Sequence, residues 1–210
     1  MIKILIADDH SIVRSGLKKI LNEDSNIEIS GEASNHHEVL SSLSVNAVDI
    51  LLLDISMPGR DGLDTLKEVK SHYPNVKVIM LSMHPEDRYA IRSIKAGASG
   101  YVSKESATEE LVNAIQRVSS GTKYISKALA EKMIEYIGVE MEIPPHELLS
   151  DREFQVLCMI ASGKTIIQIG EKLSISPSTV ATYRTRILEK LKLTTDNELV
   201  RYALGNKLID

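Results

Sequence analysis

Residues 48–54, VDILLLD, contain an apolar run without the alternation that marks a strand with one face in water. Such a run is typical of a strand covered on both faces, as in parallel sheets. Amphipathic helical stretches, such as the one with Ile12, Leu17 and Leu21, separate it from similar runs. The other runs lie at residues 3–7, 27–33, 77–81 and 100–102. This alternation predicts an α/β doubly wound, five-stranded parallel sheet.

The pattern changes after residue 122. Residues 123–145 are interpreted as a linker with one helix, ended by Pro144 and Pro145, which force extended backbone. Beyond the linker every segment is helical, with expected helices at 151–161, 165–173, 177–191 and 196–206. We therefore expect a first domain over 1–122 and a small all-α four-helix domain over 146–210.

Serines and glycines support these helix boundaries. Ser150 and Ser176 each stand just before a helical pattern, where a hydroxyl caps the first N–H groups. Gly163 and Gly205 follow helical patterns and are expected to stop them.

The composition excludes several classes of protein. No apolar run approaches the roughly 18 residues of a membrane helix, and the N-terminus turns acidic too soon for a signal peptide. The single cysteine, Cys158, cannot form an internal disulfide and fits a reducing compartment. The six histidines show no metal-ligand spacing. We therefore expect a soluble cytoplasmic protein with no membrane partner and no zinc site.

The net charge of −4 argues at first against a nucleic-acid binder. Residues 148–210 are the exception, because they hold 9 basic and 7 acidic residues. Only this part is attracted to a polyanion, and weakly. Dimerisation and directed contacts would therefore have to add affinity for DNA.

Polar side chains stand where four predicted strands end. Asp8 and Asp9 follow the first strand, Asp54 the third, Ser82 the fourth and Lys104 the fifth. This edge of a parallel sheet is where ligands bind. Clustered carboxylates need a cation, and all-oxygen ligands suit Mg²⁺. A carboxylate beside Mg²⁺ can attack a phosphoryl group and form an aspartyl-phosphate, whose oxygens Lys104 would pair with. The alternative is that each aspartate only caps a loop or turn.

A short helix, a tight turn and a longer helix over 165–191 have the spacing of a helix-turn-helix. A helical wheel of the second helix places Val180, Ile187 and Leu191 on one side. The opposite side and its margins are small and polar, which suits entry into the major groove, and its candidate base contacts are Ser178, Ala181, Thr182 and Thr185. The candidates for phosphate contacts are Thr165, Thr179, Arg186 and Lys190. An ordinary amphipathic surface helix is the alternative from periodicity alone.

Several segments resemble a known family. ADDH, LLLDISMPGRDGLDTL, IMLS and GASGYVSK resemble the receiver domains of response regulators, over about residues 1–120. The segment from LSDREF to LEKLKL resembles the LuxR-type helix-turn-helix over its whole length. The chain as a whole is thus similar to response regulators of the NarL/FixJ type, with a flavodoxin-like receiver fold. The resemblance implies a DNA-binding transcriptional regulator of a two-component phosphorelay.

The resemblance also assigns roles to single residues. It implies that Asp54 accepts phosphate from a sensor histidine kinase, and that Asp8, Asp9, Asp54 and the Ser56 carbonyl hold Mg²⁺. It implies that Ser82 turns towards the phosphoryl group while Tyr101 moves inward. In this family the final helix pairs two DNA-binding domains, which implies a homodimer on DNA. The alternative is that this helix packs only on its own domain, and both can hold. RNA polymerase is left open as a further partner.

Four positions depart from the common pattern or call for care. Met83 follows Ser82 where many receivers have a small residue, so we expect it either to slow dephosphorylation or merely to pack. Glu105 stands where many receivers have proline, which makes a cis peptide there doubtful. Ala181 replaces a lysine common in relatives, so no relative's operator sequence is transferred. By its angle on the helix, Arg184 is expected to pair with Glu153 rather than to contact DNA.

Two other functions fit part of the sequence. A phosphohydrolase with an aspartate nucleophile commonly carries a second acid two residues later, but Ser56 stands there. Turnover of a phosphate ester would revive this reading. A regulator that ignores phosphate, with a purely structural acidic pocket, predicts the same DNA affinity with and without a phosphoryl donor.

Overall fold

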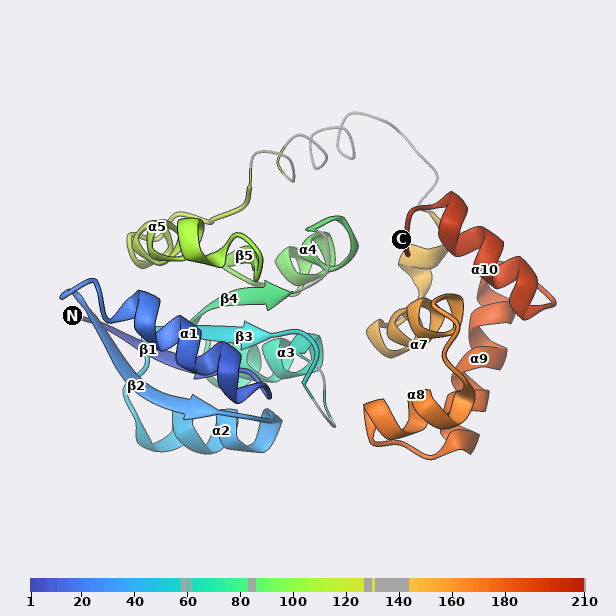
Figure 1. The fold of residues 1–210 in the computed structure, drawn as a ribbon, viewed down its shortest axis with the longest axis horizontal. Helices are drawn as coiled ribbons and strands as arrows, with labels where there is room; N and C mark the ends of the chain where they lie inside the picture. Colours follow the sequence, from blue (N-terminus) through green and yellow to red (C-terminus); the bar gives the residue numbers. More distant parts are fainter. Residues whose placement is uncertain (58–59, 61, 83–85, 127–129, 131–143, 210) are drawn as a thin grey trace. The chain divides into compact units, whose positions relative to one another are not determined.

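The computed structural model describes residues 1–210 except 58–59, 61, 83–85, 127–129, 131–143 and 210. It divides the chain into two compact units, Met1–Gly138 and Val139–Asp210 (Figure 1). Among the described residues, no helix combines the length and the apolar character that a membrane span requires. The helix expected within the linker 123–145 lies largely outside the described residues.

The first unit is built on a parallel five-stranded sheet with the order β2-β1-β3-β4-β5. The predicted fold class is thereby confirmed. The strands are β1 (Ile2–Ala7), β2 (Ile27–Ala33), β3 (Ile50–Asp54), β4 (Lys77–Ser82) and β5 (Gly100–Ser103). All five residues of β3 are buried, as its continuous apolar run predicts, because β3 lies between two strands and two layers of helices.

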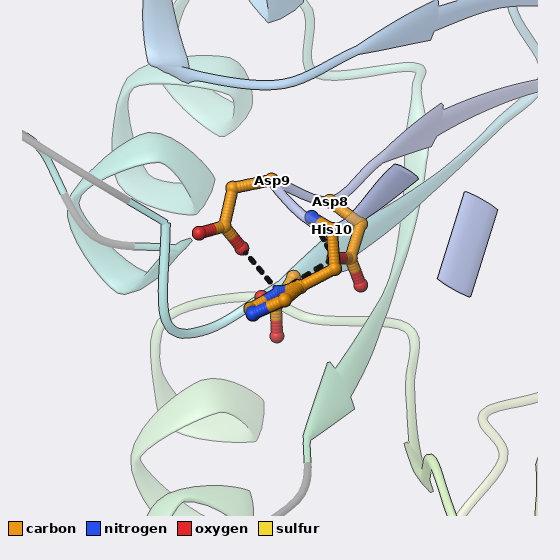
Figure 2. Close-up of side chains that lie close together, drawn as sticks. Asp8, Asp9 and His10 are labelled. Atoms are coloured by element: carbon orange, nitrogen blue, oxygen red, sulfur yellow. Dashed lines mark hydrogen bonds and ion pairs between the residues drawn. The ribbon is translucent and has the colours of Figure 1, made fainter. Parts of the chain in front are cut away.

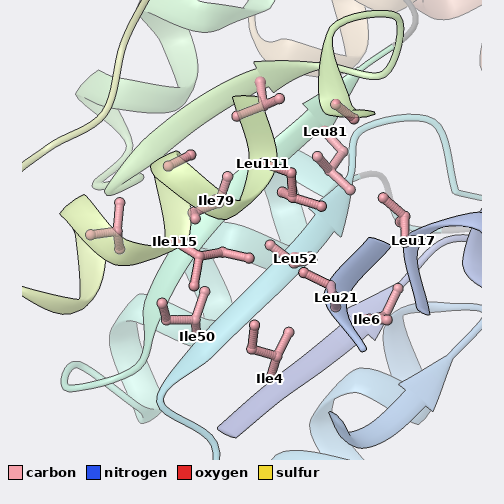
Figure 3. Packing of buried hydrophobic residues seen from close by; sticks show 14 of the residues in the cluster. Ile4, Ile6, Leu17, Leu21, Ile50, Leu52, Ile79, Leu81, Leu111 and Ile115 are labelled. Carbon is pink, nitrogen blue, oxygen red and sulfur yellow. The ribbon is translucent and has the colours of Figure 1, made fainter. Parts of the chain in front are cut away.

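Helices alternate with these strands and cover both faces of the sheet. They are α1 (Ser11–Leu21), α2 (His36–Val45), α3 (Gly62–His72), α4 (Glu86–Lys95) and α5 (Ala107–Ser119). Figure 3 shows the core on one face, where Ile4, Ile50 and Ile79 from three strands meet α1 and α5. The side chains on alternate positions, Leu5, Leu51 and Val78, are fully buried on the opposite face.

One expected core residue lies elsewhere. In α1, Leu17 and Leu21 are buried, but Ile12 is 85% exposed. The helical period therefore identified the helix and two of its anchors. At about 100° per residue, however, Ile12 lies on the side of α1 opposite Leu21, and Val13 packs against the core instead.

The backbone after α5 returns to the sheet. The Tyr101 N–H donates to the Tyr124 carbonyl at 3.1 Å, and the Tyr124 N–H donates to the Ser99 carbonyl at 3.0 Å. Gly100 and Tyr124 form an isolated parallel bridge. This bridge pairs the otherwise open side of β5, an edge strand.

The second unit is helical over its described residues. A short 3₁₀ helix, η1 (Pro145–Leu148), precedes four α-helices, which are α7 (Asp151–Ala161), α8 (Ile166–Leu173), α9 (Pro177–Leu191) and α10 (Asp196–Gly205). The core between them contains Phe154, Leu157, Ile169, Val180, Ile187 and Leu199. The four predicted helices are confirmed to within one residue at each end.

Most of the expected helix boundaries are also confirmed. Ser150 and Ser176 cap α7 and α9 by accepting hydrogen bonds from the third residue of each helix. Gly163 has φ +80° just after α7. Gly205 is a correction, because it is the last residue of α10, and the left-handed residue that follows is Lys207 at φ +54°.

Candidate functional site

Two aspartates and a lysine meet at the carboxyl edge of the sheet. Asp8 follows β1, Asp54 ends β3 and Lys104 follows β5. The Lys104 Nζ atom lies 2.6 Å from Asp8 Oδ2 and 2.9 Å from Asp54 Oδ1. The side chains of Asp8, Asp54 and Lys104 are 0%, 2% and 7% exposed. The structure thus brings these three residues into one buried ionic cluster, although any two of them are at least 46 positions apart in the sequence.

The electrostatics of this cluster raise the pKa values of both Asp54 and Lys104. Burial raises the pKa of Asp54, the neighbouring Asp8 raises it further, and Lys104 opposes them only in part. Burial lowers the pKa of Lys104, but Asp54 and Asp8 outweigh burial and raise it above its ordinary value. Two buried carboxylates therefore share one ammonium group, which leaves room for a second cation.

Asp9 and His10 lie at the rim of the same cluster. The His10 Nδ1 atom is 2.8 Å from Asp9 Oδ1 and 3.4 Å from Asp8 Oδ1, and Figure 2 shows the ring lying against both carboxylates. One ligand atom from each of Asp8, Asp9, His10 and Asp54 lies within 4.8 Å of the others. The buried Oδ2 atom of Asp54 has no hydrogen-bond partner among the described residues. Such a group of atoms can hold a metal ion.

The backbone after Asp54 is fixed by close contacts. The Ile55 N–H donates to the Leu81 carbonyl at 3.1 Å, and the Gly62 N–H donates to the Ile55 carbonyl at 2.9 Å. A Cβ atom at Gly62 would overlap the Asp54 carbonyl oxygen and lie 2.7 Å from the Ile55 Cα atom. A glycine is therefore required where α3 begins. Ser56 lies in this loop and is half-buried.

The other expected switch residues lie inside the sheet. Ser82 ends β4 and Tyr101 belongs to β5, and both are fully buried. The Lys104 N–H donates to the Ser82 carbonyl at 2.7 Å, which joins the ends of these two strands. Tyr101 is thus already buried, whereas the resemblance implies an inward movement on phosphorylation. The peptide bond between Lys104 and Glu105 is trans, and Met83 lies outside the described residues.

In the second unit, α8 and α9 are joined by a tight turn. Thr165 caps α8 in a reciprocal capping box with Gln168, and Ser174 ends α8 in the left-handed conformation at φ +54°. A Cβ atom at Gly170 would lie 2.8 Å from the Ile175 carbonyl oxygen, so this glycine lets the turn approach α8 closely. The arrangement is a helix-turn-helix.

The outer side of α9 carries the polar residues that the wheel predicts. Val180, Ile187 and Leu191 are buried. Ser178, Thr182, Thr185 and Arg186 are exposed, while Thr179 and Ala181 are half-exposed. A shallow open pocket on this side is lined by Ser178, Thr179, Thr182, Tyr183 and Arg186.

Two cations of α9 are held by carboxylates. Arg184 Nε lies 2.7 Å from Asp196 Oδ1, so the expected pairing with Glu153 is wrong. Glu153 is instead paired with Lys190, whose Nζ atom is 2.6 Å from Glu153 Oε2. Arg184 is nearer to the start of α10 than to α7, which a single-helix wheel does not reveal.

Comparison with known proteins places this arrangement in a family. A model described as the response regulator receiver domain matches residues 4–116, and a model described as bacterial regulatory proteins of the luxR family matches 147–203. The response regulator UvrY of Escherichia coli K12 is 39% identical over 209 residues, covering 99% of this chain and 96% of UvrY. The chain belongs to the NarL/FixJ-type response regulators.

Other relatives also match along nearly the whole of this response regulator. The response regulator GacA of Pseudomonas aeruginosa is 36% identical over 211 residues, covering 100% of this chain and 99% of GacA. RcsB of Salmonella enterica serovar Typhimurium, bound to promoter rprA with phosphomimetic BeF₃⁻, is 25% identical with a TM-score of 0.68. That match covers 96% of this chain and 97% of the RcsB chain.

This response regulator therefore combines a receiver domain with a LuxR-type helix-turn-helix. Phosphorylation of an aspartate is the general mechanism of receiver domains. His10 is the neighbour of the acidic cluster that the sequence analysis did not single out. The signal was present, since His10 directly follows two of the predicted ligands, but histidine spacing alone gave no reason to choose it.

Proposed function

We propose that Asp54 accepts a phosphoryl group from a sensor histidine kinase, and that phosphorylation controls DNA binding by α9. The buried position of Asp54, which Lys104 bridges to Asp8, supports this proposal most strongly. The free energy lost when buried charges leave water can exceed the attraction between them, so a gain in stability alone is a poor explanation for this ionic cluster. Phosphoryl transfer, in contrast, needs both an attacking oxygen and a nearby cation.

The chemistry requires one bond to form and one to break. An oxygen of Asp54 attacks the phosphorus of a phosphohistidine, the new O–P bond forms as the N–P bond breaks, and the histidine nitrogen leaves with the bonding electrons and takes a proton. Lys104 is positioned to move from Asp54 Oδ1 to an oxygen of the arriving phosphoryl group. Burial keeps water away from the product.

Mg²⁺ fits the donors that surround Asp54. Asp8, Asp9 and Asp54 offer carboxylate oxygens, and the buried Oδ2 atom of Asp54 has no other hydrogen-bond partner in the described part of the chain. We propose that these three residues and the Ser56 carbonyl hold the ion, which keeps its remaining waters. When bound, Mg²⁺ neutralises charge on the transferring group.

Ser82 and Tyr101 are proposed to report the phosphate. Ser82 ends the strand beside β3, so its hydroxyl is within the same edge of the sheet as Asp54. Tyr101 lies one strand further along, paired with Met80 of β4. A change at Asp54 is thereby passed to β5 through neighbouring strands, which makes the strand ends a two-state element.

The exposed side of α9 is proposed to read the major groove in a homodimer, with Thr165, Thr179, Arg186 and Lys190 at phosphates. The Thr182 hydroxyl donates to the Ser178 carbonyl at 3.0 Å, and the Thr185 hydroxyl donates to the Ala181 carbonyl at 3.1 Å. Both hydroxyls therefore present lone pairs outward, which suits acceptance from the amino groups of adenine or cytosine. Ser178 and Ala181 complete this surface.

The test is binding to fragmented genomic DNA at fixed salt, with and without a small-molecule phosphoryl donor and Mg²⁺. The donor should strengthen binding to particular fragments, and Asp54→Asn should abolish that increase. Asp49→Asn, an exposed residue at the opposite edge of the sheet, is the matched control and should respond normally. An undiminished donor response in Asp54→Asn would refute the proposal. Selective binding that ignores the donor would leave only the DNA-binding half.

A further inference from the structure

His10 is attached to the acidic cluster without a role in the proposed phosphoryl transfer. Its imidazole lies 2.8 Å from Asp9 and 3.4 Å from Asp8, while its backbone N–H donates to Asp8 Oδ1 at 2.8 Å. The side chain is 66% exposed and makes no capping hydrogen bond to α1. An exposed histidine held against two carboxylates can serve as a nitrogen ligand for a metal ion.

The four donor residues nearly match a compact metal site. One atom from each of Asp8, Asp9, His10 and Asp54 lies within 4.8 Å of the others. Around a four-coordinate ion with bonds near 2.1 Å, neighbouring donor atoms are about 3.4 Å apart. A contraction of about 1.4 Å in the widest of these separations is therefore sufficient. Asp9 is 28% exposed and His10 66%, so these two side chains have room to move inward, whereas Asp8 and Asp54 stay fixed by Lys104.

We propose that His10 makes this pocket a mixed oxygen–nitrogen site for divalent ions of the zinc class, which compete there with Mg²⁺. The inference rests on the proposed function, because it concerns the same pocket. Mg²⁺ demands oxygen ligands and retains water, so it gains little from an imidazole. Zn²⁺ accepts histidine nitrogen together with aspartate oxygen in a four-coordinate shell. In the Irving–Williams order, a site with nitrogen and oxygen ligands also binds Zn²⁺ more tightly than Mn²⁺ or Fe²⁺.

The experiment compares Zn²⁺ and Mg²⁺ binding to the full chain by calorimetry at one pH and ionic strength. His10→Ala should weaken Zn²⁺ binding at least about tenfold, the loss typical even of outer-shell partners, and leave Mg²⁺ binding unchanged. His10→Asn is a second variant, which lacks the imidazole but retains a residue favoured at the N-cap of α1. His37→Ala removes an exposed histidine of α2 and should change neither affinity.

A direct readout of the ligand accompanies the affinities. In ¹⁵N-histidine-labelled protein, Zn²⁺ should shift the side-chain nitrogen resonances of His10 and leave those of His37 in place. Excess Mg²⁺ should reverse the shift, because both ions use the same carboxylates. These changes are not expected from a histidine that only forms an ion pair with Asp9.

The outcomes separate this proposal from the proposed function. Unchanged Zn²⁺ affinity in His10→Ala, in a protein that still binds Mg²⁺ and accepts phosphate, overturns the nitrogen-ligand role alone. An equal loss of Zn²⁺ binding in His37→Ala places the ion elsewhere and also overturns it. Absence of binding by either ion, together with no phosphorylation of Asp54, overturns both proposals.

Discussion

The Nζ atom of Lys190 lies 2.6 Å from Oε2 of Glu153, so the last turn of α9 is tied to the first turn of α7. Glu153 is almost fully buried, and its carboxylate also accepts the Ser150 N–H at 2.7 Å. This ion pair joins α9 to α7. It gives a structural role to Lys190, which was predicted to contact DNA.

Lys190→Ala should destabilise the helical domain by about 1 kcal/mol, the worth of a hydrogen bond to a charged group discounted for the partly exposed lysine. The measurement is the rate of hydrogen exchange at the α7 amides at increasing urea concentrations, which gives the free energy of unfolding of this helix. Lys172→Ala, an exposed lysine at the end of α8, is the control and should change stability little. Equal stability of the two variants would show that the pair contributes nothing.

The same pair should make the stability of the helical domain depend on pH in the acid range. Burial raises the pKa of Glu153, but hydrogen bonds from Lys190 and Ser150 outweigh it and hold the pKa below the ordinary value of 4.5. A depressed pKa means that the charged form stabilises the fold above pH 4.5, and that this contribution is lost as the pH falls through the folded-state pKa.

Glu153→Gln should therefore be less stable than the natural chain at pH 7, with the difference narrowing in acid. Unfolding free energies measured at several pH values between 7 and 3 provide the check. Glu189→Gln, an exposed residue of α9, is the matched substitution and should keep the natural pH profile. A constant difference between Glu153→Gln and the natural chain would contradict the assigned cause.

Gly62→Ala should impair both stability and phosphorylation, because the new Cβ atom would collide with the backbone of Asp54 and Ile55. We expect a loss of unfolding free energy of at least about 2 kcal/mol, since the clash involves backbone on both sides. Gly16→Ala on α1 is the contrast, because among the described residues no atom outside the adjacent backbone of α1 lies within 4 Å of its Cβ position. It should stabilise α1 by about 0.5–1 kcal/mol. Thermal unfolding and donor-dependent phosphorylation of both variants test this difference.

Arg186 and Arg184 should differ in their effects on DNA binding. Arg186 is exposed beside the pocket of α9, whereas Arg184 is paired with Asp196. Arg186→Ala should weaken binding and reduce the slope of log affinity against log salt by about 1, as expected for one lost phosphate contact. Arg184→Ala should leave that slope nearly unchanged. Identical slopes in the two variants would remove Arg186 from the interface.

Local sequence signals predicted most of the fold. Strand ends, helix caps at Ser150 and Ser176, and the buried run of β3 follow from patterns within about ten residues, so sequence reasoning reached them. The strand ends were also enough to predict that Asp8, Asp54 and Lys104 meet, because parallel strands share one carboxyl edge.

Contacts between helices could not be read in the same way. The partners of Arg184 and Lys190 depend on the angles at which α7, α9 and α10 cross, and a helical wheel contains no information about them. The exposure of Ile12, in contrast, was readable from the sequence, because its angle on α1 is opposite that of Leu21. His10 was missed because its ring position depends on the turn between β1 and α1, which brings it back over Asp8 and Asp9.

The bridge between Tyr124 and β5 couples the edge strand of the receiver domain to the segment that leads into the linker. The segment that leads out of the domain is fastened by two hydrogen bonds to the backbone on either side of Gly100, beside the proposed switch residue Tyr101. A displacement of β5 must either pull Tyr124 along or break both bonds. A movement of β5 that begins at the phosphorylation site can therefore shift the backbone of Tyr124 and, through the covalent chain, the start of the linker.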